Sequence, residues 1–111
     1  MSTRVALIVI GTFKEDWWGL APVAQANFVS RVGEIAQAAG LEPQAGYRLA
    51  ATPGAFLEIW EGKDHASVDR AVNDLKAMGY TRFVDARWLI GERELQAPKP
   101  APRTRRVART S

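Results

Sequence analysis

The sequence predicts an α+β domain of the ferredoxin-like type. In this fold a βαββαβ order of elements gives a four-stranded antiparallel sheet with two helices on one face. Three observations predict it. First, strand-like runs rich in β-branched residues alternate with segments of helical periodicity. Second, a Pro-Gly turn separates the second and third strand-like runs. Third, the chain has 111 residues, 47% of them hydrophobic, which suffice for one hydrophobic core and not for two.

The first half of the chain predicts a strand, a loop and a helix. Residues 4–13 are an almost continuous apolar run, which indicates a strand covered on both faces. Residues 14–21 are expected to form a loop with two adjacent tryptophans. Pro22 suits the first turn of a helix, and Gly40 suits its end. The apolar residues between them recur at spacings of three and four: Phe28, Val32, Ile35, Ala36 and Ala39.

The second half predicts a hairpin, a helix and a last strand. Residues 46–52 and 55–61 read as two strands joined at Pro53-Gly54. Asp64 is a candidate N-cap for a second helix, which Gly79 ends. Residues 83–90 complete the sheet. The buried stripe of the second helix is expected to be Val68, Ala71, Val72, Leu75 and Met78.

The charge distribution divides the chain into a domain, residues 1–95, and a tail, residues 96–111. The chain has a net charge of +3, but the tail carries five basic residues and no acidic one, so residues 1–95 carry −2. Three prolines in five residues and Arg/Thr repeats predict a disordered basic tail, because this composition buries little apolar surface. Its arginines suit phosphate contacts, but no aromatic residue is interleaved and the acidic domain offers no basic platform, so a nucleic-acid partner is not expected.

The composition excludes several classes of chemistry. The chain has no cysteine and one histidine, His65, which excludes thiolate catalysis and multi-histidine metal sites; no metal and no cofactor are expected. No apolar run approaches the roughly 20 residues that cross a bilayer, so no membrane partner is expected. The N-terminus lacks a signal-peptide pattern, which makes a cytoplasmic location the expectation.

An apolar open face of the sheet predicts a homodimer. Both sets of alternating residues in the first strand are apolar, Val5, Leu7 and Val9 on one face and Ala6, Ile8 and Ile10 on the other. Two helices cover only one face, and a bare apolar sheet indicates a partner. We therefore expect two copies to pack sheet against sheet.

Short motifs along the chain resemble a known family. The sequence WGLAP at 18–22 precedes a helix, FLEIW occupies 56–60, and a helix ending in GY at 79–80 is followed by FVD at 83–85. In the order and spacing of these motifs, residues 4–94 resemble the darcynin-like proteins of the dimeric α+β barrel superfamily. The resemblance implies a dimeric α+β barrel with a small molecule between sheet and helices, similar to the cofactor-independent antibiotic-biosynthesis monooxygenases.

Haem-degrading members of that superfamily resemble the chain at Trp60 but differ elsewhere. Their haem-ligating histidine lies inside the second helix, and the corresponding residue here is Asp69. The asparagine of their first strand is also missing, since residues 4–13 contain none. These departures argue against haem.

Glu58 and His65 are the candidate catalytic residues. Glu58 alternates with Phe56 and Trp60 on one strand face, and an apolar pocket would raise its pKa and make it a general base. The alternative is a structural ion pair between Glu58 and Arg48 or Arg87. His65 follows the predicted N-cap and suits a proton shuttle at the pocket mouth; the alternative is a solvent-exposed residue of the first turn.

Aromatic residues and one amide are the candidate substrate-binding residues. Tryptophan combines a flat apolar face with an N–H donor, which suits a ring-shaped ligand. The alternative for the adjacent pair is that one tryptophan packs at the core edge and the other supports the dimer. The candidates are Trp17, Trp18, Asn27, Trp60, Tyr80 and Trp88.

The predicted function is binding of a small apolar or aromatic molecule. As an enzyme, the chain would carry out cofactor-independent, monooxygenase-like oxygenation or a proton-transfer rearrangement of a polyketide-like or phenolic substrate, as the resemblance implies. The alternative is a non-catalytic dimeric module that senses a ligand or serves as a scaffold.

Overall fold

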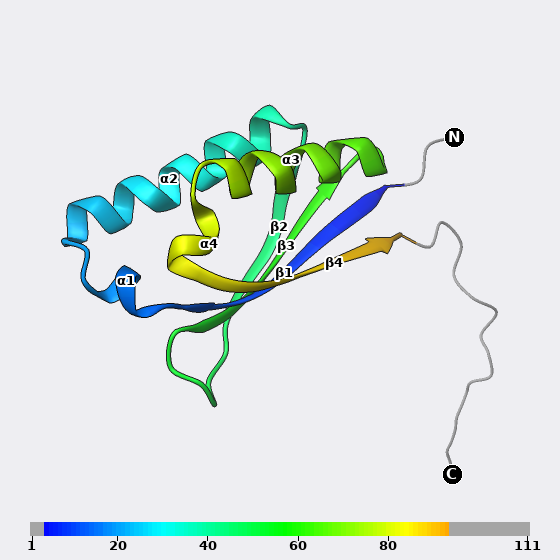
Figure 1. Cartoon of the computed structure of the whole chain (residues 1–111). Coiled ribbons are helices and arrows are strands. Elements are labelled where there is room, and N and C mark those ends of the chain that lie inside the picture. Colours follow the sequence, from blue (N-terminus) through cyan, green and yellow to red (C-terminus); the bar gives the residue numbers. More distant parts are fainter. Residues whose placement is uncertain (1–3, 94–111) are drawn as a thin grey trace, which may run out of the picture.

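The computed structural model describes residues 4–93 and contains four strands and four helices (Figure 1). Residues 1–3 and 94–111, which include the predicted basic tail, lie outside the described residues. The elements in chain order are β1 (Val5–Phe13), α1 (Glu15–Trp18), α2 (Pro22–Ala38), β2 (Glu42–Arg48), β3 (Ala55–Gly62), α3 (His65–Ala77), α4 (Tyr80–Phe83) and β4 (Val84–Glu92).

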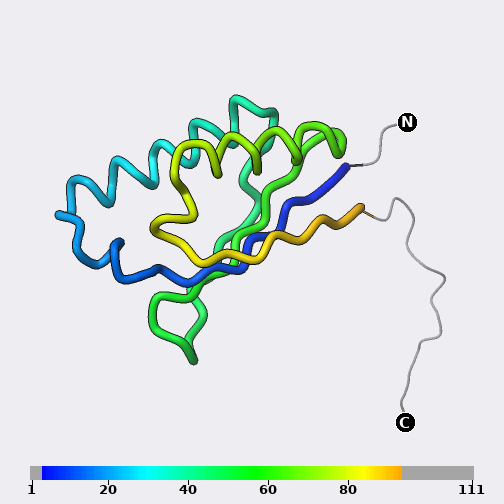
Figure 2. The backbone as a smooth tube through the Cα atoms, viewed as in Figure 1, coloured from blue at the N-terminus to red at the C-terminus, as the bar shows by residue number. Residues whose placement is uncertain are grey.

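The four strands form one antiparallel sheet in the order β2-β3-β1-β4, with α2 and α3 on the same side of it (Figure 1). Strand β1 is central; it pairs with β4 along its whole length and with β3 from Val5 to Thr12. In Figure 2 the course of the backbone shows β1 and β4 side by side, with the two helices above them. The predicted ferredoxin-like α+β fold is confirmed.

The core lies between α3 and the centre of the sheet. On β1 the alternate residues Val5, Leu7 and Val9 are buried beneath the helices. Val68 of α3 and Leu41, just after α2, are also fully buried in this cluster. The two-residue period of a strand thus gives the central strand one face in the core and one face away from it.

The second strand begins earlier than the sequence predicts. It spans Glu42–Arg48 rather than residues 46–52, and an irregularity in its pairing falls between Pro43 and Ala45. Residues 49–54 instead form a wide turn, which is closed by hydrogen bonds from Leu49 N to Ala55 O (2.9 Å) and from Ala55 N to Thr52 O (3.1 Å). The Pro-Gly pair therefore belongs to a longer turn than expected, and β2 begins four residues earlier in the sequence, closer to the end of α2.

Two short helices also differ from the expectation. Part of the predicted loop 14–21 forms α1, and α4 precedes the last strand. Lys14 N donates to Phe83 O at 2.8 Å, and Arg82 Nε lies 3.3 Å from Asp16 Oδ2, so the two short helices are joined.

The predicted helix signals are confirmed at both ends of α3. The Asp64 side chain accepts a hydrogen bond from Ser67 N at 2.9 Å, as an N-cap does. Gly79 follows the helix with φ of 94°, a left-handed conformation that side-chain-bearing residues rarely adopt. Within residues 4–93, no helix is long and apolar enough to cross a membrane.

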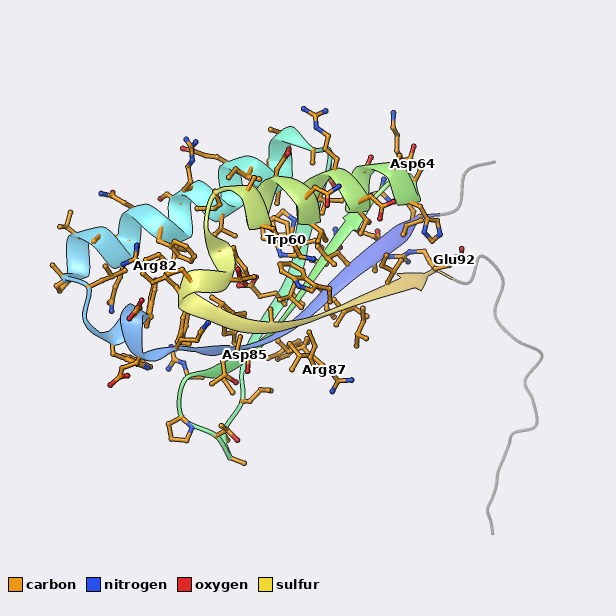
Figure 3. All side chains as sticks on the ribbon, in the orientation of Figure 1. Trp60, Asp64, Arg82, Asp85, Arg87 and Glu92 are labelled. Atoms are coloured by element: carbon orange, nitrogen blue, oxygen red, sulfur yellow. The ribbon has the colours of Figure 1, made fainter. Side chains whose placement is uncertain are left out.

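The face of the sheet away from the helices is mostly apolar. Register places Ile8 and Ile10 of β1 on this open face, next to Ile59 and Leu57 of β3. Leu89 of β4 is on the same face and 40% exposed. Asp85 and Arg87 also lie on this face, below the sheet in Figure 3. The structure therefore has the apolar open face on which the homodimer prediction rests.

Candidate functional site

A cavity of about 190 Å³ lies between α2 and the β3–β1 part of the sheet. Its walls are mostly aromatic and aliphatic, and Glu58 is the one carboxyl group among them. The lining residues are Phe13, Phe28, Val29, Val32, Gly33, Phe56, Glu58, Trp60, Tyr80 and Val84.

Glu58 is the point where the cavity meets two shallower grooves. One groove continues past Trp18, Tyr47 and Arg48, and the other past Pro43 and Gln44. Glu58 lines the cavity and both grooves. A ligand seated in the cavity therefore has the Glu58 carboxyl group at the place where the cavity opens.

Two glycines keep the space around Glu58 open. Gly33 of α2 lines the cavity, and a Cβ added there would meet no atom within 4 Å. Gly46 of β2 is paired with Glu58 and also has nothing within 4 Å of an added Cβ. Side chains at either position would narrow the approach to the carboxyl group.

A third glycine sets the position of one wall. A Cβ on Gly11 of β1 would lie 2.6 Å from Phe56 Cζ and 2.8 Å from Val84 Cγ1, which is closer than such atoms approach. Gly11 thus allows the Phe56 ring to lie across the central strand, where it forms part of the cavity wall.

Burial raises the pKa of Glu58, and a hydrogen bond from Trp60 partly offsets this. Trp60 Nε1 donates to Glu58 Oε1 at 3.3 Å. The alternative ion pairs are not found among residues 4–93: Arg87 lies on the opposite face of the sheet, and Arg48 lines the outer groove without an ion pair to Glu58. Glu58 is thus a half-buried carboxyl group whose charge no described cation balances.

Tyr80 forms the far wall of the cavity. Its side chain is buried, and burial together with the negative charge of Glu58 raises the pKa of its hydroxyl. Its ring stacks on Phe28 at 5.8 Å and lies 5.3 Å from Trp88. Tyr80 therefore stays neutral at physiological pH and presents an uncharged hydroxyl group.

The two adjacent tryptophans have different surroundings. Trp17 is buried, stacks on Phe13 with ring centroids 4.2 Å apart, and meets Phe28 edge-on at 5.5 Å. It supports two cavity residues without lining the cavity itself. Trp18 is 61% exposed and lines the outer groove beside Gly54. Trp17 thus follows the predicted core-edge alternative.

The structure brings some predicted site residues together and leaves others apart. Trp60 and Tyr80 line the cavity with Glu58, as Figure 3 shows for Trp60 between helices and sheet. Trp88 packs behind Tyr80, and Asn27 is exposed on α2, outside the lining.

His65 lies away from the cavity. It is exposed at the start of α3, and its Nε2 atom lies 2.9 Å from Glu92 Oε2 at the end of β4. Figure 3 shows Glu92 and the neighbouring Asp64 at that end of the molecule, apart from Trp60. His65 does not line the cavity, in agreement with the alternative of an exposed first-turn residue.

The sequence interpretation missed several cavity residues. Phe28 and Val32 were predicted only as members of the apolar face of the helix; they pack against the core and also line the cavity. Periodicity identifies the face that a helix turns inward, but it does not show whether that face meets side chains or open space. Among residues 4–93, no group of three or more His, Asp or Glu residues could hold a metal ion.

The fold is similar to those of two enzymes of known structure. A variant of chlorite dismutase from Candidatus Nitrospira defluvii is 12% identical, with a TM-score of 0.64 over 84% of this chain and 41% of that chain. SnoaB, a cofactor-independent oxygenase from Streptomyces nogalater, is 14% identical, with a TM-score of 0.63 over 88% of this chain and 100% of that one. The chain thus spans about two fifths of the dismutase and the whole of SnoaB.

These likenesses concern the fold. The architecture shared with both structures is an α+β fold with one four-stranded antiparallel sheet. No family model and no curated protein matches the sequence.

Proposed function

We propose that the chain binds a small apolar or aromatic molecule in the cavity between α2 and the sheet. The observation that carries the proposal is the placement of the Glu58 carboxyl group in a wall that is otherwise aromatic and aliphatic. The similarity of the fold to SnoaB, described as a cofactor-independent oxygenase, supports a monooxygenase-like role, and the sequence motifs support the darcynin-like resemblance.

As an enzyme, the chain would use Glu58 as a general base. Its raised pKa brings the carboxylate closer to the basicity needed to remove a proton from an activated C–H or O–H group of a phenolic or polyketide-like substrate. Return of that proton to another atom of the substrate completes a rearrangement. In the oxygenase form, the deprotonated substrate reacts with dioxygen, one oxygen atom enters the product as a carbonyl, and the other leaves as water.

The experiment is a ligand screen combined with two matched helix variants. Aromatic ligands are titrated while tryptophan fluorescence is recorded, because Trp60 lines the cavity. Gly33→Leu places a side chain in the cavity and should weaken binding by at least tenfold. Ser30→Leu on the exposed surface of α2 should leave binding unchanged. Equal binding by both variants would place the ligand elsewhere and overturn the proposal.

Glu58→Gln separates the enzyme from the binding module. Glutamine keeps the size of the side chain and cannot accept a proton at neutral pH. If turnover is lost even at ligand concentrations that saturate the variant, Glu58 acts as the base. The second candidate function is a non-catalytic dimeric module that senses a ligand or serves as a scaffold. The position of His65 favours it, because His65 lies outside the cavity and Glu58 is then the one candidate base in the lining.

We also propose that the chain is a homodimer joined through the open face. The apolar residues Ile8, Ile10 and Ile59 support it, because such a surface loses contact with water when two sheets pack together. The cavity lies on the other side of the sheet, so dimer formation leaves it accessible.

A further inference from the structure

We propose that the natural ligand of the cavity is an organic cation, a protonated or quaternary ammonium group attached to an aromatic or apolar body. The inference rests on the proposed function, since it names the charge of the molecule that the cavity binds. It is carried by the juxtaposition of aromatic rings with one carboxylate in a wall that has no cationic side chain.

The first observation is the number of aromatic rings around the cavity. Five of them line it: Phe13, Phe28, Phe56, Trp60 and Tyr80. The face of an aromatic ring carries partial negative charge, and it attracts a cation within about 6 Å of its centre. Several rings around one space favour an ammonium group over a neutral group of the same shape.

The second observation is the charge of the lining. Glu58 is the one acidic residue in it, and no Lys, Arg or His lines the cavity among the described residues. Tyr80 adds a neutral hydroxyl group. Arg48 is exposed and belongs to the outer groove, where it forms no ion pair with Glu58 within residues 4–93. The lining is therefore negative whenever Glu58 is ionised.

The environment of Glu58 disfavours other ligand charges. An anion would meet a carboxylate and the negative faces of rings, with no cation to balance it. A neutral ligand would exclude water from Glu58, which would then remain as an uncompensated charge or take up a proton, and either outcome costs free energy near pH 7. A cation removes that cost, because it supplies the charge that the protein lacks.

The size of the cavity sets the size of the ligand. A cavity of 150 Å³ in another protein holds a benzene molecule, so about 190 Å³ accommodates one ring with a small ammonium group. Larger bodies would extend past Glu58 into the adjoining grooves.

The test compares two probes of almost identical shape. Phenyltrimethylammonium carries a positive charge, and tert-butylbenzene replaces its nitrogen with carbon. Binding of each to the full chain at pH 7 is measured by NMR titration. We expect the cation to bind at least tenfold more tightly, and benzoate, an anion of similar size, not to bind.

Two variants show where the preference arises. Glu58→Gln should remove the preference for the cation by at least tenfold while tert-butylbenzene still binds. Glu34→Gln makes the same substitution at an exposed residue of α2 outside the cavity lining and should leave both affinities unchanged. An equal loss in Glu34→Gln would indicate general attraction to an acidic domain and would overturn the inference.

The outcomes separate the inference from the proposed function. If tert-butylbenzene binds as tightly as the cation and Gly33→Leu blocks it, the cavity is a binding site but not for cations. If neither probe binds and the wider ligand screen is also negative, both proposals fall.

Discussion

Two glutamates three residues apart on β3 show how strongly local surroundings set acidity. Glu58 faces the helices, where burial raises its pKa. Glu61 faces the open side, where hydrogen bonds from Arg93 (Nη2 to Oε2, 2.8 Å) and Arg4 (Nε to Oε1, 3.2 Å) lower its pKa. The same side chain on one strand therefore affects folding stability in opposite directions as the pH changes.

Glu58→Gln should increase thermal stability at neutral pH. A raised pKa in the folded state means that the folded protein holds the proton more tightly, so ionisation of Glu58 destabilises it as the pH rises above about 4.5. Glutamine removes this effect. The gain in melting temperature should be larger at pH 7 than at pH 4, and a gain that does not change with pH would contradict the assignment.

Glu61→Gln should have the opposite effect. A lowered pKa means that ionised Glu61 stabilises the folded state above its ordinary pKa and that this stability is lost as the pH falls. The variant should melt about 4–8 °C lower at pH 7, since ion pairs with partly exposed arginines contribute up to about 1 kcal/mol and that amount shifts the melting temperature of a domain of this size by several degrees. Near pH 3 the two proteins should melt together; a constant difference would show a packing effect instead.

At the scale of elements, the cavity depends on the way α2 crosses the sheet. Helix α3 covers the central strands and contributes Val68, Ala71 and Leu75 to the buried core, whereas α2 buries only Ala36. Between α2 and β3 the space is partly open, and Tyr80 of α4 lines it. The helix that covers least of the sheet therefore forms the roof of the cavity.

Gly33→Ala tests the cost of the glycine in that roof. Glycine inside a helix lowers stability by about 0.5–1 kcal/mol relative to alanine, and the added methyl group here would meet no atom within 4 Å. Alanine should therefore raise the free energy of unfolding by about that amount in urea denaturation. A loss of stability would mean that the space next to Gly33 is smaller than described.

At the scale of the whole molecule, the two faces of the sheet differ in what covers them. The helix side contains the core and the cavity, and the open side presents an apolar surface that includes Ile8 and Leu89. A domain with a large apolar face is expected to bury it against a partner. With the proposed site on one face and the proposed interface on the other, each copy of a dimer would bind its own ligand.

Ile8→Glu tests the dimer. A charge at the centre of the open face should prevent two sheets from packing, so light scattering at micromolar concentration should change from dimer to monomer. Val23→Glu, on the 68% exposed surface of α2, serves as the control and should leave the mass unchanged. A wild-type protein that is already monomeric would refute the proposed interface.

The sequence alone determined the fold class and the features that depend on near neighbours in the chain. Pro22 begins α2, Asp64 caps α3 and Gly79 ends it, because these signals act within one helical turn. Alternation along β3 placed Glu58 between Phe56 and Trp60 on one face, since a strand has a period of two. Glu58 and Trp60 were predicted as site residues on this basis, and Tyr80 as one of the aromatic residues near the end of the second helix.

Only the tertiary structure decided which of the predicted residues line the cavity. Strand β2 lies several residues earlier than predicted, because its position depends on pairing with β3 rather than on its own composition. Phe28 lines the cavity, Trp17 packs against Phe28, and His65 lies at the other end of the molecule beside Glu92. These positions depend on the distance of α2 from the sheet and on the direction of each side chain. Both follow from contacts between residues that are far apart in the sequence. Local sequence specifies the elements, and only their packing creates the space between them.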